Sequence, residues 1–165
     1  MVVAYILNFL AGCQGLLGKF GSMYYENVFL NGQFWRCITH MYLHAGAIHM
    51  VMNMAALLVV GKYIEKKYGS LWYLIFFHMI AILDAIIVSL IFSGESVGAS
   101  AGIFATIGIL VILLYKKQIS IKKPESIYLI AFFVVSLVLG IESLVVHLIA
   151  LAIGLLLGFL ECSQI

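Results

Sequence analysis

Two residues with the side chains of a hydrolytic enzyme lie within stretches that are otherwise apolar. Ser100 occupies a Gly-Ala-Ser-Ala-Gly segment, and His147 follows two valines and precedes Leu-Ile-Ala. A serine hydroxyl becomes a good nucleophile when a base removes its proton, and imidazole has a pKa suited to that task near neutral pH. A histidine in a membrane helix is rare enough to be a functional candidate by default. The pair therefore indicates hydrolysis inside a bilayer, provided that the apolar stretches span one.

Acyl transfer also requires hydrogen-bond donors that stabilise the oxyanion formed on the substrate carbonyl. Close to a helix N-terminus, Ser100 would offer its own backbone N–H group and the positive end of the helix dipole. His49 and Asn53 are four residues apart, so on a helix they share one face and can add side-chain donors. We therefore expect His49 and Asn53 to belong to the same site as Ser100 and His147.

No acidic residue is well placed to complete a catalytic triad. Glu95 and Glu142 fall at junctions between apolar runs, and Asp84 lies deep within one. A carboxylate mainly orients the imidazole and selects its tautomer, and helix packing can also fix the ring. We therefore expect a Ser-His dyad. The sequence assigns no role to Asp84, whose burial is costly unless the group is protonated or paired.

The composition is that of a membrane protein. Of the 165 residues, 65% are hydrophobic and 10% are charged, and the mean hydropathy of +1.18 lies outside the range of a soluble domain. One proline and scattered glycines favour helices over a β-barrel, whose short alternating strands would be separated by turns. The net charge of +2 indicates no particular partner, and we expect no nucleic acid.

Six apolar runs approach the length of about 20 residues that a membrane-spanning helix needs. They predict an all-α polytopic membrane protein, with six transmembrane helices in one bundle and a single domain over residues 1–165. The first run is the weakest, because polar residues and glycines interrupt it. The runs cover residues 2–17, 46–64, 71–92, 98–115, 125–141 and 143–160.

The basic residues predict which side of the membrane each connection faces. Seven of the nine Lys and Arg residues lie at the end of the second run or just after it, or between the fourth and fifth runs. Because basic loops stay in the cytoplasm, both termini are predicted to be cytoplasmic and residues 18–45 external. The second, fourth and sixth runs then all start at the external side. At about 1.5 Å per residue, His49, Ser100 and His147 would lie within roughly two turns of that surface.

Small residues allow the helices that carry these candidates to approach closely. Gly154 and Gly158 form a G-x-x-x-G pattern, and His147 lies seven residues before Gly154 on the same helix face. Glycines also leave little side-chain volume around Ser100 in the fourth run. Such faces also occur in ordinary helix packing, but they permit Ser100 and His147 to come within hydrogen-bonding distance.

The cysteines and the remaining histidines indicate no metal site. Cys13, Cys37 and Cys162 lack the spacing of a disulfide framework or a zinc site. The Leu-Ala-Gly-Cys segment that ends at Cys13 resembles a lipobox, but no Lys or Arg precedes it as a signal peptide requires. His40 and His44 have helical spacing without an evident third ligand, so we expect interfacial histidines and neither a metal nor a cofactor.

Four segments share their order and spacing with a known family. They are Phe34-Trp35-Arg36, His44-x4-His49-x3-Asn53, Gly98-Ala99-Ser100, and His147 with the following Ala150, Gly154 and Gly158. From about residue 34 to residue 160, the chain thus resembles the rhomboid intramembrane serine proteases. The resemblance implies a six-helix core, a first external loop partly in the outer leaflet, Ser100 as nucleophile and His147 as general base. It also implies an oxyanion hole formed by His49, Asn53 and the Ser100 backbone.

The same resemblance gives Trp35 and Arg36 a structural role in anchoring the first loop, although plain interfacial residues would also suit these positions. The chain departs from the family pattern at three positions. Ala101 and Ala150 stand where the family usually has Gly, and Phe104 stands where it commonly has an aromatic hydroxyl. The departures concern the reaction rate and the support of His147 more than the fold.

We therefore expect an intramembrane serine endopeptidase that cleaves transmembrane protein substrates near the outer membrane boundary. Its partners would be these substrates and membrane lipid, in a plasma membrane such as the bacterial inner membrane. Substrates with Gly, Ala or Ser near the boundary would unwind most readily. Two alternatives stay open: a catalytically inactive relative that binds membrane clients, and a small proton-handling transporter that uses His44, His49, Asp84 and His147.

Overall fold

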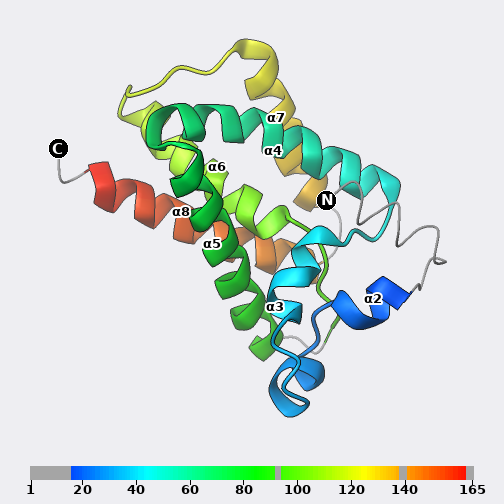
Figure 1. Cartoon of the computed structure of the whole chain (residues 1–165). Helices are drawn as coiled ribbons and strands as arrows, with labels where there is room; N and C mark the ends of the chain where they lie inside the picture. The colour runs from blue at the N-terminus through cyan, green and yellow to red at the C-terminus, as the bar shows by residue number, and fades with distance from the viewer. Residues whose placement is uncertain (1–15, 92–93, 138–140, 163–165) are drawn as a thin grey trace.

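The computed structural model describes residues 16–91, 94–137 and 141–162 (Figure 1). Apart from one isolated bridge between Met23 and Ser96, the secondary structure of these residues is helical. Five long helices follow a group of short ones. In chain order the elements are α2 (Leu16–Gly21), η1 (Glu26–Leu30), α3 (Arg36–Thr39), η2 (His40–Tyr42), α4 (Ala47–Tyr68), α5 (Ser70–Ile91), α6 (Ser100–Tyr115), α7 (Lys123–Leu137) and α8 (Ile141–Cys162).

The long helices correspond to five of the six predicted apolar runs, whereas residues 2–15 of the first run lie outside the described residues. Three described helices are long and apolar enough to cross a membrane, namely α4, α5 and the Ser143–Glu161 part of α8. The helix α6 is also apolar but has only 16 residues. The described part of the chain is therefore all-helical with three helices of spanning length, and the six-span bundle stays a prediction.

The helix α6 lies at the centre of the bundle. Twelve of its 16 residues are buried, whereas a surface helix buries only one stripe. It contacts α4, α5 and α8, and Figure 1 shows these three helices around it. Because its neighbours cover it on several sides, its first residue, Ser100, is only 9% exposed.

The helices α6 and α8 touch backbone to backbone. A Cβ atom on Gly154 would lie 1.9 Å from the carbonyl oxygen of Ala105, and one on Gly108 would lie 2.5 Å from that of Leu151. These distances leave no room for any side chain, so the predicted close approach at Gly154 is confirmed. The interface fixes the position of the helix that begins with Ser100 relative to the helix that carries His147.

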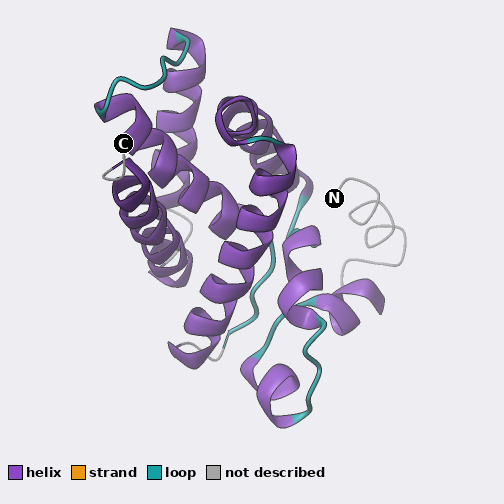
Figure 2. Ribbon diagram, turned by 60° about the vertical axis from the view of Figure 1, so that its left-hand side comes forward, coloured by secondary structure: helices purple, strands orange, loops and turns teal. Residues whose placement is uncertain are grey.

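The short helices before α4 form a separate group beside the long ones (Figure 2). Arg36 is buried at their centre, and its guanidinium donates hydrogen bonds to the carbonyl oxygens of Ser22 at 2.5 Å and Lys19 at 2.6 Å. The indole Nε1 of Trp35 donates to the Phe20 carbonyl at 3.0 Å. Trp35 and Arg36 therefore tie the polypeptide around α2 to α3.

The lysine-rich connections meet at the end of the bundle opposite the start of α6. The carboxylate of Glu125, near the start of α7, accepts hydrogen bonds from the Lys62 ammonium and the Tyr63 hydroxyl of α4. The backbone N–H of Lys122 donates to the Tyr63 hydroxyl at 3.2 Å. The connections predicted to be cytoplasmic are thus close together in space and remote from Ser100.

Candidate active site

A glycine with a left-handed backbone delivers Ser100 to the start of α6. Gly98 has a φ of +119°, which L side chains rarely adopt. A Cβ atom on Gly98 would also lie 3.0 Å from the His49 ring and 4.0 Å from the Ser100 Oγ. Gly98 therefore meets both a conformational and a steric requirement. As the first residue of α6, Ser100 lies among the amide groups that a helix leaves without intrahelical partners.

His49 and Asn53 lie near the start of α4, on one helix face. Asn53 is buried, and its Nδ2 donates a hydrogen bond to the His49 carbonyl oxygen at 2.8 Å. An amide nitrogen has two donors, so one N–H of Asn53 stays available for another acceptor. His49 itself lies against Gly98, and its ring is 5.2 Å from the ring of His44 in an edge-on arrangement.

The imidazole of His147 is buried and held by an aromatic stack. Its ring lies 4.2 Å from that of Phe104, centroid to centroid, with 10° between the planes. Phe104 is one turn beyond Ser100 on α6 and contacts Phe132 and Phe133 of α7. In the described part of the chain, the Nδ1 atom of His147 has no hydrogen-bond partner. Packing against α6 thus orients the ring without a carboxylate.

Two cavities meet at the candidate residues. One has a volume of about 370 Å³ and the other of about 220 Å³, and His49, Ser100 and His147 line both. Asn53 lines the smaller cavity. The structure therefore brings together the four residues that the sequence predicted for one site. Within the described residues no hydrogen bond joins the Ser100 hydroxyl to His147, and such bonds often tighten only when substrate is bound.

Trp35 and Arg36 line neither cavity, but Arg36 is connected to the site through His40. The Nδ1–H of His40 donates to the Arg36 carbonyl at 3.0 Å, and the His40 carbonyl accepts the N–H of Gly98 at 2.9 Å. Burial lowers the pKa of His40 to about 4, so its ring is neutral at pH 7. Among the described residues, neither His40 nor His44 belongs to a group of three or more metal-ligand side chains.

Sequence reasoning missed two residues of the larger cavity, His40 and Asp84. The sequence predicted only an interfacial position for His40. Its spacing of four residues from Arg36 could have indicated a hydrogen bond along a helical turn. Asp84 had no assigned role. The cysteine at position 13 lies outside the described residues, and Cys37 is a buried free thiol.

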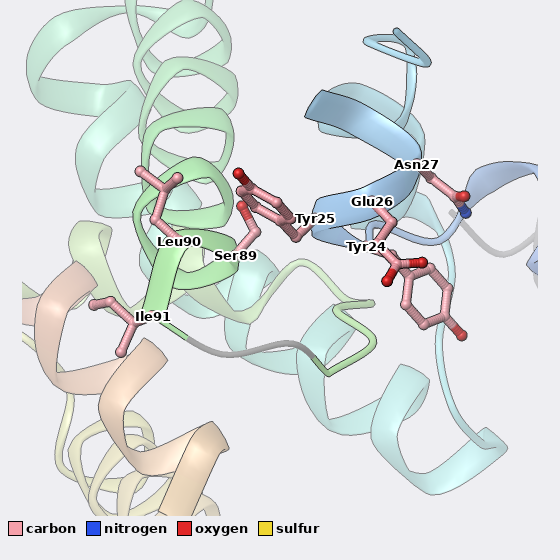
Figure 3. A pocket seen from close by; sticks show the side chains of 7 residues that line it. All are labelled: Tyr24, Tyr25, Glu26, Asn27, Ser89, Leu90 and Ile91. Atoms are coloured by element: carbon pink, nitrogen blue, oxygen red, sulfur yellow. The ribbon is translucent and has the colours of Figure 1, made fainter. Parts of the chain in front are cut away.

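A further cavity, of about 550 Å³, lies between the start of η1 and the C-terminal part of α5 (Figure 3). Residues 24–27 and 89–91 line it, and Figure 3 shows Tyr25 beside Ser89. The Ser89 hydroxyl donates to the Ile86 carbonyl at 2.9 Å. Because its lining contains no histidine, this cavity offers Ser89 no imidazole base.

Comparison with known proteins decides the family. Residues 31–164 match the family model described as the Rhomboid domain. The chain belongs to the rhomboid family. This match confirms the resemblance seen in the sequence, and together with the long apolar helices it indicates an integral membrane protein.

Relatives from a plant and from a bacterium illustrate the similarity. The chain is 31% identical to "RHOMBOID-like protein 6, mitochondrial" of Arabidopsis thaliana over 94% of its own length and 53% of the relative's. It is 29% identical to "Rhomboid protease GluP" of Bacillus subtilis (strain 168), over 70% of this chain and 23% of that protein. An Arabidopsis relative named "Inactive RHOMBOID-like protein 8" is 27% identical over 61% of this chain and 29% of its own. The chain thus spans about half the length of the first relative and less of the others.

Proposed function

We propose that this rhomboid protein is a serine endopeptidase that cleaves transmembrane protein substrates within the membrane, through a dyad of Ser100 and His147. One observation carries the proposal: Ser100 from α6, His147 from α8 and His49 from α4 line the same two cavities. Rhomboid proteases among the relatives support the reaction class.

The proposed reaction has two stages. His147 accepts the proton of the Ser100 hydroxyl as its Oγ attacks the substrate carbonyl carbon, and then gives that proton to the leaving amine when the peptide bond breaks. Water next attacks the acyl-enzyme after giving a proton to His147, which returns it to Ser100 Oγ as the acid is released. The Ser100 backbone N–H, the His49 side chain and the free Asn53 N–H are the proposed donors to the oxyanion.

The proposed position of cleavage follows from the lysines. The lysine-rich connections lie at the end of the bundle remote from Ser100, and basic loops favour the cytoplasmic side. The cavities would then open to the external side, with both termini cytoplasmic in a plasma membrane. Substrates would be cut near the outer boundary of their helices, where Gly, Ala or Ser makes unwinding easier.

Purified protein in liposomes, given a generic transmembrane substrate, tests the dyad. Ser100→Ala and His147→Ala should each lower the cleavage rate by about 10³-fold or more, because the two groups act as a unit. Ser89→Ala is the matched control, since Ser89 is another buried serine of a membrane helix outside the site. Cleavage that survives Ser100→Ala contradicts the proposal.

The cleavage position is a separate test. Mass spectrometry of the products should place the cut in the outer part of the substrate helix. A cut near the cytoplasmic end would contradict the proposed orientation of the site, while leaving the dyad intact.

One observation favours a second candidate function, because a relative of comparable identity is named inactive. In that case the same cavities would bind membrane clients without cutting them. Labelling with a fluorophosphonate separates the two: folded protein with an activated Ser100 should be labelled, and Ser100→Ala should not. A folded wild-type protein that resists labelling favours the inactive candidate.

A further inference from the structure

The cavity between η1 and α5 lies apart from the candidate active site. Its volume of about 550 Å³ falls within the range of about 300–1,000 Å³ that is typical of small-molecule sites. None of its lining residues belongs to either of the two cavities at Ser100. A molecule bound between η1 and α5 would therefore not occupy the position of a substrate peptide bond.

This cavity lies at a boundary of the membrane. The helix α5 has 22 residues, and at about 1.5 Å per residue it matches the hydrocarbon core of a bilayer, which is about 30 Å thick. Its last residues, Leu90 and Ile91, therefore lie at one edge of that core. They are 62% and 57% exposed, and Leu30 at the end of η1 is 69% exposed. Because large apolar side chains in this position face lipid, the molecule beside the cavity in a bilayer is a lipid.

The two walls of the cavity differ in polarity. Leu90 and Ile91 form the wall on the α5 side, whereas Tyr24, Glu26 and Asn27 come from the polypeptide at the start of η1. Figure 3 shows the Glu26 carboxylate beside the Tyr24 ring, across the cavity from the end of α5. An apolar wall that faces lipid and a polar wall opposite it suit the junction between the acyl chains and the headgroup of a phospholipid.

The charge of the polar wall is negative. Glu26 is the only charged residue among the lining residues that the structure describes, and its carboxylate forms no salt bridge within the described part of the chain. Burial raises the pKa of the Tyr24 hydroxyl, and the neighbouring Glu95 carboxylate raises it further. The Arg36 guanidinium acts on Tyr24 in the opposite direction, but it is buried and already bound by three oxygen acceptors. Charge complementarity therefore favours a cationic group in this cavity.

The chemistry of Glu26 also indicates which cation fits. An ionised carboxylate only accepts hydrogen bonds, and a primary ammonium offers it three N–H donors. Such charge-assisted hydrogen bonds are about twice as strong as neutral ones. A quaternary ammonium carries the same charge but has no N–H to donate. The Tyr25 hydroxyl, on the same wall, can donate to a phosphate oxygen.

We propose that the cavity between η1 and α5 binds a membrane phospholipid whose headgroup ends in a primary ammonium, such as phosphatidylethanolamine. Glu26 accepts the hydrogen bonds of the ammonium, and Leu90 and Ile91 contact the start of the acyl chains. The bound lipid joins the short helices before α4 to the end of α5, so it stabilises the folded protein by mass action. This assignment is independent of the proposed protease function.

A coupling reaction tests the contact between the ammonium and Glu26. Purified protein in nanodiscs that contain phosphatidylethanolamine is treated with a carbodiimide, which activates exposed carboxyl groups. The lipid amine then attacks the activated carbonyl carbon, forming an amide and releasing the urea. Mass spectrometry of the digested protein locates the modified residues. Free ethanolamine, which has the same amine without acyl chains, measures how reactive each carboxyl group is by itself.

The ratio of lipid coupling to ethanolamine coupling should be at least about tenfold higher at Glu26 than at Glu161, because a bound lipid has a high effective concentration. Glu161 is a matched control, since it is a partly exposed acid near the end of another long helix, α8, and outside the cavity. Equal ratios at the two residues overturn the proposal.

Lipid affinity provides a second test. Short-chain phosphatidylethanolamine and phosphatidylcholine are titrated into protein in detergent, and the rise of the thermal midpoint gives the affinity of each. The two lipids share the same phosphate, so binding of that phosphate by lysines contributes equally to both. The wild type should bind phosphatidylethanolamine about tenfold more tightly. The isosteric Glu26→Gln should reduce this ratio to within about twofold, and Glu161→Gln should keep the wild-type ratio.

Equal affinities for the two lipids in the wild type, or an unchanged ratio in Glu26→Gln, overturn the assignment of Glu26. Soluble phosphoethanolamine separates a lipid from a free small molecule, and it should bind at least about tenfold more weakly because it lacks the chains. If it binds as tightly as the lipid, the assignment to a membrane lipid fails. Ser100→Ala protein should show the wild-type lipid preference, so this result does not depend on proteolysis.

Discussion

The contact between α6 and α8 and the attachment of α7 are built in different ways. The first pair touches through backbone atoms at Gly108 and Gly154. The helix α7 is attached to α4 by polar side chains, with Glu125 bound by Lys62 and Tyr63, and with the Tyr128 hydroxyl donating to the Met52 carbonyl at 2.8 Å. The helices that carry Ser100 and His147 thus have the contact that tolerates least displacement. The proposed dyad of Ser100 and His147 would therefore depend on the α6–α8 contact much more than on the attachment of α7.

The largest expected effect comes from adding a methyl group to the α6–α8 contact. Gly154→Ala would place a Cβ atom 1.9 Å from a backbone oxygen, and the helices must separate because backbone cannot rotate away. We expect a loss of about 3 kcal/mol in the free energy of unfolding and a fall in cleavage rate of about 10²-fold. Thermal unfolding and the liposome cleavage assay measure the two effects.

Gly158→Ala provides the graded comparison for that variant. Its Cβ would lie 3.1 Å from the Ile112 Cβ and 3.2 Å from the Ile109 Cα. A displacement of a few tenths of an ångström accommodates these contacts, so both losses should be clearly smaller. Wild-type stability and activity in Gly154→Ala would show that the α6–α8 contact is not as tight as described.

The next effect is expected where the two regions meet, at Phe104. This side chain stacks on His147 and also contacts α7. Phe104→Leu keeps an apolar residue but removes the stack, so the imidazole should sample more orientations. We expect kcat to fall about tenfold with KM changed less than twofold, as for a loss of orientation. Phe76→Leu, in α5 and outside both site cavities, should leave kcat/KM within about twofold of wild type.

A pH dependence of stability is expected from His40, which connects the first loop to the site. Burial lowers its pKa from 6.5 to about 4. As pH falls below about 6.5, the unfolded chain takes up a proton that the folded protein resists, so stability is lost as pH falls between these two values. The loss from this one residue reaches about 3 kcal/mol. The thermal midpoint measured from pH 7.5 to pH 4.5 should fall accordingly.

His40→Asn sharpens that measurement, because the amide N–H can still donate to the Arg36 carbonyl but the side chain does not titrate. Its thermal midpoint should change less over the same pH range than that of the wild type. His44, whose pKa burial also lowers to about 4, accounts for part of the remaining slope. Equal slopes in the two proteins would contradict the assignment to His40.

The smallest effect is expected at the attachment of α7. The Lys62 and Glu125 side chains are partly exposed to solvent, which weakens their attraction, so Glu125→Gln should lower the thermal midpoint only slightly. The cleavage rate should stay within about twofold of wild type, because Glu125 is remote from the site. Lys62→Met and the double variant complete the cycle that isolates the pair. A loss of activity comparable to that of Gly154→Ala would abolish the distinction between the two regions.

Apolar run length and small-residue spacing were enough to predict the long helices and their meeting at one site. The sequence placed Ser100, His147, His49 and Asn53 together because the order of the helices determines which ends lie side by side. It could not place Asp84. The helix α5 is apolar on nearly all sides, so its hydrophobic pattern does not indicate which face turns towards α6.

The role of His40 was hidden for another reason. Its contacts depend on how a loop of short helices folds against the connection before α6, and no local pattern determines that arrangement. The sequence also suggested six spans, the first of them the weakest, whereas α6 is a helix of 16 residues that is largely buried. Length alone does not distinguish a helix surrounded by lipid from one surrounded by other helices.

The path from Arg36 through the His40 ring and carbonyl to the Gly98 amide ends two residues before Ser100, the proposed nucleophile. The path starts at the backbone carbonyl of Arg36, which every Arg36 variant keeps, whereas its guanidinium binds polypeptide around α2 and α3. A screen that scores variants only by proteolytic output would rank a variant that displaces α3 with variants of Ser100 and His147. Variants that disrupt the short helices before α4 and variants that remove a reacting group would give the same low output in such a screen. Fluorophosphonate reactivity of Ser100, recorded beside the folded fraction, tells them apart.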